Sequence, residues 1–231
     1  MKRRLSPALL SACLATLLLP LAGWSQTIPS PYRPIENGQE AGVFLGTFSA
    51  STGQFDLGPK SGLLFGARYA VEVGGPVFLE GMTTLLSTTR DIIDPRRAEG
   101  DRSIGEADVS LFAIDVRFGF SLTGRRTWNG VSPYLILGGG IAFDGAKRAD
   151  LEEALLPEDR FEFGTSFTTA LGGGVRYVLS DQLMLRSDFT LNLWKLSTPT
   201  GFDDPDKGLE SVPEDQWVGG LGLTLGASWR F

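Results

Sequence analysis

Residues 221–231 read LGLTLGASWRF, and large apolar side chains occupy almost every second position of this stretch. Leu221, Leu223 and Leu225 alternate with glycine and threonine, and the alternation continues through Trp229 to Phe231. A period of two is typical of a β-strand because successive side chains point to opposite faces of the sheet. The stretch therefore predicts a strand with one apolar face and one face of small, polar or ionic residues.

The same alternation recurs along the chain and predicts eight strands. No apolar stripe of period 3.6 longer than two helical turns interrupts the pattern, so strands are expected throughout. The expected strands are residues 41–50, 62–73, 76–90, 107–122, 132–144, 162–179, 183–196 and 217–231.

The composition of the two faces indicates which of them is inside. The polar columns hold mainly Gly, Ala, Ser and Thr with isolated charges, whereas the apolar columns hold no charge. A charged side chain facing lipid near the bilayer centre costs about 2–4 kcal/mol, so an uncharged column suits hydrocarbon. Open sheet edges are not tolerated in lipid, so the sheet must close. We therefore expect an all-β fold, an eight-stranded antiparallel up-and-down transmembrane β-barrel.

Connection lengths agree with this fold. The connections after the second, fourth and sixth expected strands are short, and the other four contain about 11, 16, 17 and 20 residues. Bacterial outer-membrane barrels combine short periplasmic turns with longer extracellular loops. The pattern predicts a periplasmic N-terminus and long loops outside the cell.

The N-terminus is typical of a cleavable signal peptide. Lys2, Arg3 and Arg4 precede an uncharged run, and small residues at positions 23 and 25 fit cleavage after Ser25. We expect a signal peptide at residues 1–25, an extended lead-in at 26–40 and the barrel at 41–231. A retained helical anchor and lipoprotein processing at Cys13 are the alternatives. Cleavage after Ser25 removes Cys13, the only cysteine.

Composition excludes several functions. The 231 residues include 21 Lys and Arg, 27 Asp and Glu and no histidine, which gives a formal net charge of −6. This charge offers no broad positive field for nucleic acid. Without histidine the chain lacks the usual general base and the commonest zinc ligand. We therefore expect neither an enzyme nor a cofactor, although a mechanism that uses carboxylates alone stays an alternative.

Charged residues on the polar columns are expected to form an ion-pair network inside the barrel. Arginines accompany carboxylates there in similar number, so mutual neutralisation is the simplest arrangement. The expected members are Arg68, Glu72, Glu80, Asp115, Arg117, Arg176, Arg186, Asp188 and Arg230.

Aromatic residues near the strand ends predict two girdles at the membrane interfaces. Trp217 and Trp229 share a face, and twelve residues at about 40° tilt correspond to roughly 30 Å across the membrane. The expected girdle residues are Phe120, Tyr134, Phe143, Phe163, Tyr177, Trp194, Trp217 and Trp229.

These residues carry a family resemblance. The C-terminal pattern of Leu223, Leu225, Ala227, Trp229 and Phe231, together with the glycine-rich segments 133–140 and 171–180, resembles the small bacterial outer-membrane β-barrels. This family includes the membrane domain of OmpA. The resemblance implies recognition of the C-terminal pattern by the barrel-assembly machinery, periplasmic chaperones during export, and contact with lipids and lipopolysaccharide. No peptidoglycan-binding domain is expected after the barrel.

The last long loop is rich in carboxylates, and its Asp203, Asp204, Asp206 and Glu210 are weak candidates for a divalent-cation site. The chain is therefore expected to be a non-enzymatic barrel of the bacterial outer membrane, structural or surface-binding through its extracellular loops. A narrow channel for ions or small solutes is the alternative. A soluble periplasmic lipocalin-like ligand binder is a more distant one.

Overall fold

The computed structural model describes residues 30–36, 38–146, 148–209 and 211–231. The predicted signal peptide, including Cys13, lies outside the described residues, as do the first residues of the predicted lead-in.

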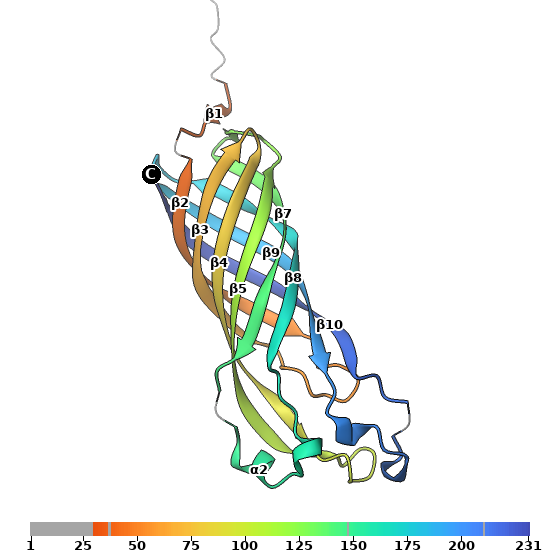
Figure 1. Cartoon of the computed structure of the whole chain (residues 1–231). Coiled ribbons are helices and arrows are strands. Elements are labelled where there is room, and N and C mark those ends of the chain that lie inside the picture. Colours follow the sequence, from red (N-terminus) through yellow and green to blue (C-terminus); the bar gives the residue numbers. More distant parts are fainter. Residues whose placement is uncertain (1–29, 37, 147, 210) are drawn as a thin grey trace, which may run out of the picture. The chain divides into compact units, whose positions relative to one another are not determined.

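Eight long strands form a closed antiparallel barrel (Figure 1). Each strand pairs with the next along the chain, and the last pairs with the first, so the sheet has no open side in the barrel wall. The strands are β2 (Gln39–Ala50), β3 (Gly62–Gly74), β4 (Val77–Ile93), β5 (Ser103–Ser121), β7 (Val131–Asp144), β8 (Thr165–Val178), β9 (Leu183–Ser197) and β10 (Asp215–Arg230). The predicted eight-stranded barrel is confirmed.

Short elements lie in the connections and before the barrel. Strand β1 (Tyr32–Pro34) pairs with β6 (Arg126–Trp128), which lies between β5 and β7. The long loops contain α2 (Asp150–Glu153) and the 3-10 turns η1 (Pro157–Asp159), η2 (Thr200–Phe202) and η3 (Pro205–Lys207). None of the helices in the described ranges has the length and hydropathy needed to span a bilayer.

Large apolar side chains cover the outside of the barrel, but β2 carries them on both faces, so its alternation alone does not decide which face is inside. On β2, Val43 and Leu45 are 64% and 69% exposed, whereas Phe44 and Phe48 are 4% and 7% exposed. The same alternation holds on β10, where Leu221, Leu223 and Leu225 are all exposed. This exterior would be unstable in water because it forms a continuous apolar surface. It suits the hydrocarbon of a bilayer and excludes the soluble lipocalin-like alternative.

One close approach shows why small residues are needed on the inner face. The ring of Phe78 lies against Gly119, its partner on the neighbouring strand β5, and a Cβ at that position would lie 1.9 Å from Phe78 Cζ. The wall therefore accepts a large inward ring because its neighbour carries no side chain.

The strands extend further at one end than the alternation predicts. β4 continues to Ile93 and β5 begins at Ser103, so the loop between them spans only residues 94–102. Their register pairs Asp91 with Glu106 and Ile92 with Gly105. This part of the hairpin lacks the uncharged outward column on which the prediction depends.

Candidate functional site

The centre of the lumen is occupied by the side chain of Arg186, which is fully buried. Its Nη1 donates to Glu80 and to Glu40, the latter at 3.1 Å, and its Nη2 lies 3.2 Å from Asp188 Oδ1. Its Nε donates to the hydroxyl oxygen of Tyr134 at 2.6 Å, and Tyr134 in turn donates to Asp188. Residues of four strands, β2, β4, β7 and β9, thus meet at one guanidinium.

Two further arginines complete this cluster. Arg68 Nη1 donates to Asp188 Oδ2 at 2.6 Å, so this carboxylate receives two cations from different strands. Arg176 Nε lies 3.4 Å from Glu40 Oε2, and its guanidinium carbon lies 3.9 Å from the ring centroid of Phe78. Aromatic faces and carboxylates surround the arginines, which offsets the cost of burying their charge. We call Glu40, Arg68, Glu80, Tyr134, Arg176, Arg186 and Asp188 the Arg186 cluster.

The structure places the predicted interior charges in more than one group. Asp115 and Arg117 form a separate pair at 3.3 Å, and Thr168 donates to Asp115 at 3.0 Å. Arg230 is buried near the end of β10. Glu72 instead lies at the mouth of the barrel, partly exposed, with Oε2 3.0 Å from Arg125 Nε.

Sequence reasoning missed two members of the Arg186 cluster. Glu40 was assigned to the lead-in, but Gln39 and Glu40 already belong to β2. Glu40 continues the inward column of Phe44 and Phe48, and this spacing was the available signal. Tyr134 was predicted to face lipid, and that prediction is wrong because its side chain is 1% exposed and donates to Asp188.

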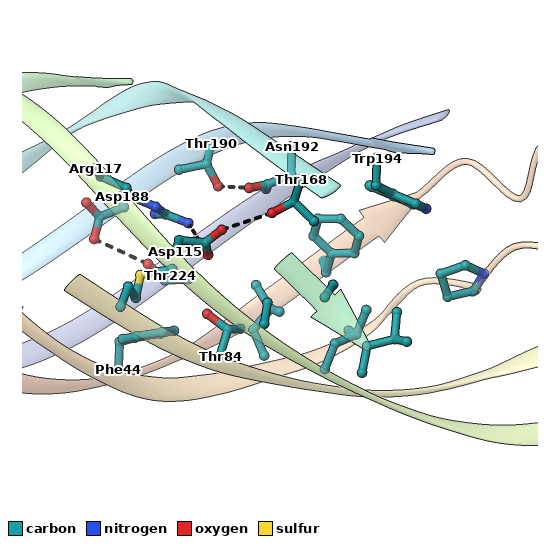
Figure 2. A pocket seen from close by; sticks show the side chains of 18 of the residues that line it. Phe44, Thr84, Asp115, Arg117, Thr168, Asp188, Thr190, Asn192, Trp194 and Thr224 are labelled. Atoms are coloured by element: carbon teal, nitrogen blue, oxygen red, sulfur yellow. Dashed lines mark hydrogen bonds and ion pairs between the residues drawn. The ribbon is translucent and has the colours of Figure 1, made fainter. Parts of the chain in front are cut away.

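A cavity of about 90 Å³ lies beside the Arg186 cluster within the lumen (Figure 2). Its lining is polar around Asp115, Arg117 and Asp188 and apolar around Phe48 and Trp194. Within the described residues, Arg117 Nε and Thr84 Oγ1 have no hydrogen-bond partner. A space of this size holds several waters, which can hydrogen-bond to these groups.

The long loops fold together into what we call the extracellular cap, formed by residues 51–61, 94–102, 145–146, 148–164, 198–209 and 211–214 with the adjoining strand ends. Leu57, Phe161, Phe202 and Leu209 come from three different loops and are buried in one apolar cluster. Trp194 of β9 joins the same cluster. The loops therefore share a core and do not extend separately into solvent.

Ion pairs reinforce the extracellular cap. Asp159 is buried and accepts from Arg96 at 2.8 Å and from Lys207 at 3.0 Å, which links three loops. Arg90 of β4 donates to the buried Glu152 of α2. On the outside, hydrogen bonds to Glu106 and Asp91 raise the pKa of Lys60.

The acidic side chains of the last loop make their contacts within that loop. Asp203 accepts from the backbone of Val212, and Asp204 accepts from the backbone of Asp206 and lies 3.6 Å from Lys207. Glu210 lies outside the described residues. In the described part of the chain, no three carboxylates, cysteines or histidines are grouped as a metal site would require.

The aromatic residues predicted for the girdles divide into two sets. Five of them are exposed on the outside of the barrel, namely Phe120, Phe143, Tyr177, Trp217 and Trp229. The prediction is wrong for Trp194, which is 5% exposed and packs on Phe48 with ring centroids 5.6 Å apart. It is also wrong for Phe163, which precedes β8 and packs against the extracellular cap.

The residues of the predicted assembly pattern share the outer face of β10. Leu223, Leu225, Ala227 and Trp229 are exposed there, and Phe231 follows the strand. Their recognition by the assembly machinery stays a prediction.

A closed antiparallel barrel with an apolar exterior and an ionic interior defines a small outer-membrane β-barrel. The predicted class and the outer-membrane location are thereby confirmed.

The comparison with solved structures gives one neighbour that supports the fold and two more remote ones. Neisserial surface protein A is similar at a TM-score of 0.50 and 15% identity, covering 87% of this chain and 98% of that one. The N-terminal β-barrel domain of OprF from Pseudomonas aeruginosa gives a TM-score of 0.40 and 11% identity, covering 83% and 99%. A major outer membrane protein from Thermus thermophilus gives a TM-score of 0.41 and 16% identity, covering 84% of this chain and 99% of that one. No family model and no curated protein matches the sequence. At these identities the likeness concerns the fold alone.

Proposed function

We propose that this chain is a non-enzymatic outer-membrane barrel that acts through its extracellular cap. The observation that carries the proposal is the shared core of the cap, in which Leu57, Phe161 and Phe202 from three loops are buried together. Loops that fold against one another present a fixed surface, and a fixed surface loses less conformational entropy when it binds.

The lumen supports the non-enzymatic part of the proposal. Glu80, Asp188 and Glu40 each contact one or more arginines, so these carboxylates are engaged in ion pairs. A general acid or base needs access to a substrate proton, and these groups lie inside the wall of a closed barrel. The cluster therefore serves to fill and brace the barrel.

The Arg186 cluster also argues against the channel alternative. Eight-stranded barrels have an interior just wide enough for their own side chains. Here Arg186, Phe78 and Tyr134 occupy it with almost no exposed surface. We therefore expect a barrel that does not conduct at rest.

The test compares the wild-type protein with a loop-replaced variant, in which residues 145–164 and 198–214 become short Gly-Ser turns. Both proteins should show heat-modifiable migration on a gel, which indicates a folded barrel. Intact cells that display each protein are then tested for retention on protein-coated and polysaccharide-coated surfaces. We expect retention by the wild type and its loss in the variant. Equal retention would contradict the proposal, and so would stable, selective currents from the wild-type protein in a planar bilayer.

A further inference from the structure

The segment before the barrel folds back onto a distant connection. Strand β1 forms an antiparallel ladder with β6, in which Tyr32 pairs with Trp128, Arg33 with Thr127 and Pro34 with Arg126. Backbone hydrogen bonds extend the ladder at both ends, from Ile35 N to Arg125 O and from Asn129 N to Pro31 O. We call residues 31–36 the strap.

The order of the strands shows where the strap runs. It leads into β2, but its partner β6 lies in the connection between β5 and β7. In the closed ring β2-β3-β4-β5-β7-β8-β9-β10, this connection is on the side opposite β2. The strap therefore crosses the mouth of the barrel at the end where β2 begins and β10 ends (Figure 1). This is the end with the short turns, which faces the periplasm in outer-membrane barrels.

One apolar side chain of the strap enters this mouth. Ile35 is 8% exposed, and it borders a space of about 10 Å³ together with Phe78, Arg176, Met184 and Arg230. Such a space holds at most about one water molecule. Ile35 therefore leaves little room for solvent above the Arg186 cluster, whose Arg176 lines the same space.

The backbone ladder of the strap is short. Its ladder contains three residue pairs, and its partner segment is held to β3 by the half-exposed Arg125, whose Nε lies 3.0 Å from Glu72 Oε2. The three residues of β1, Tyr32, Arg33 and Pro34, are all exposed. Ile35, which follows them, is buried. The barrel ladders are much longer, with eleven pairs between β2 and β10. Local opening occurs first where buried apolar contacts are fewest.

We propose that the strap is a releasable closure of the periplasmic mouth. When it is bound, Ile35 keeps water from the periplasmic side of the Arg186 cluster. When it is released, the mouth becomes accessible down to that cluster, while the barrel wall and the extracellular cap keep their structure. The strap thus controls solvent access to the lumen from the side opposite the cap.

The test measures the reaction rate of an introduced thiol. The protein is produced from residue 26 onward and refolded into nanodiscs, so Cys13 is absent. The reporter is Met184→Cys, because Met184 is 1% exposed and borders the space below Ile35. The matched control is Met82→Cys, because Met82 is also buried and inward but lines the cavity on the cap side. The probe is a charged methanethiosulfonate reagent.

Each reporter is measured in two backgrounds, the native strap and a strap replaced by six Gly and Ser residues. We expect replacement to speed modification of the Met184→Cys reporter by about tenfold or more, because the local closure is lost. The rate for the Met82→Cys reporter should not change. Equal rates for the Met184→Cys reporter in both backgrounds would overturn the proposal, and so would equal acceleration of both reporters, since that indicates loosening of the whole barrel.

A milder variant and a reversible lock complete the design. Ile35→Gly removes the buried side chain but keeps the ladder residues, and we expect it to accelerate the Met184→Cys reporter in the same direction. Arg33→Cys together with Thr127→Cys places two thiols at paired positions, whose separation suits a disulfide. We expect this disulfide to form on oxidation in the folded protein. Its failure to form would contradict the register on which the strap depends.

Discussion

Glu80 on β4 and Arg186 on β9 form an ion pair in which neither side chain is exposed. The two strands are third and seventh in the closed ring that starts at β2, so they lie on opposite sides of the barrel. The pair therefore spans the lumen and connects parts of the wall that share no backbone hydrogen bonds.

Removal of one partner should be costly. Arg186→Leu leaves Glu80 buried without its cation, and we expect the free energy of unfolding to fall by about 3–5 kcal/mol. Arg148→Leu is the control, because the Arg148–Glu162 pair is exposed and should contribute at most about 1 kcal/mol. Equilibrium unfolding in urea, followed by heat-modifiable migration, measures both. Adding Glu80→Leu to Arg186→Leu should recover part of the lost stability, because no buried charge is then left unpaired. If Arg186→Leu and Arg148→Leu lose the same stability, the Arg186 cluster does not brace the barrel.

The outer face should reject charge according to depth. Leu223 lies near the middle of β10, and Leu223→Arg should cost about 2–4 kcal/mol. Leu183 lies at the start of β9 opposite Trp229, and Leu183→Arg should cost at most about 1 kcal/mol because the charge reaches the interface. Unfolding in lipid vesicles compares the two. A Leu223→Arg variant as stable as the wild type would show that this face does not contact hydrocarbon.

The glycine beside Phe78 should tolerate no side chain. In Gly119→Ala the new Cβ overlaps the Phe78 ring, which is held between Arg176 and Tyr134, so we expect a loss of about 1–3 kcal/mol. Gly81→Ala meets no atom within 4 Å and should be neutral or slightly stabilising. The folded fraction after refolding into detergent, read from a gel, separates the two variants. Identical folded fractions would mean that the ring moves aside freely.

The extracellular cap should open independently of the barrel. Phe202 is fully buried, and Phe202→Ala should weaken the cap by about 3–5 kcal/mol. We expect faster proteolysis within residues 198–214 while the heat-modifiable barrel persists. Leu156→Ala is the control because Leu156 is 43% exposed. If the cap resists protease equally in both variants, the loops do not depend on their shared core.

The sequence predicts the barrel well because hydrocarbon imposes a strict rule on every second residue. Leu221, Leu223 and Leu225 obey that rule, whereas the outward Thr83 and Ser87 of β4 are polar but uncharged, so the rule excludes charge more strictly than it requires large apolar side chains. The rule is lost beyond the membrane, which explains why the alternation ends β4 at residue 90 and begins β5 at residue 107, although the strands reach Ile93 and start at Ser103. Strand β1 has only three residues, and its pairing with β6 depends on the tertiary fold, so no local pattern indicates it.

The site was predictable in kind but only partly in detail. The alternation assigns Arg186 and Asp188 to the interior, but it does not state which charges meet across the lumen. At Trp194 two sequence signals conflict. Its position two residues after the inward Asn192 indicates an inward side chain, whereas its aromatic character favours a girdle on the outside. Position decides the outcome, since an aromatic ring reaches the interface only from the outer face.

The β4–β5 hairpin is much longer than a membrane crossing requires. Its strands contain 17 and 19 residues, and about 9–11 tilted residues cross a bilayer. The surplus of roughly eight residues corresponds to about 25 Å of strand. The tip near Gly100 therefore lies beyond the headgroups, and the bond from Arg96 to Asp159 holds it within the extracellular cap. A foreign epitope spliced in beside Gly100 would be presented to antibodies on living cells without disturbing the wall beneath it.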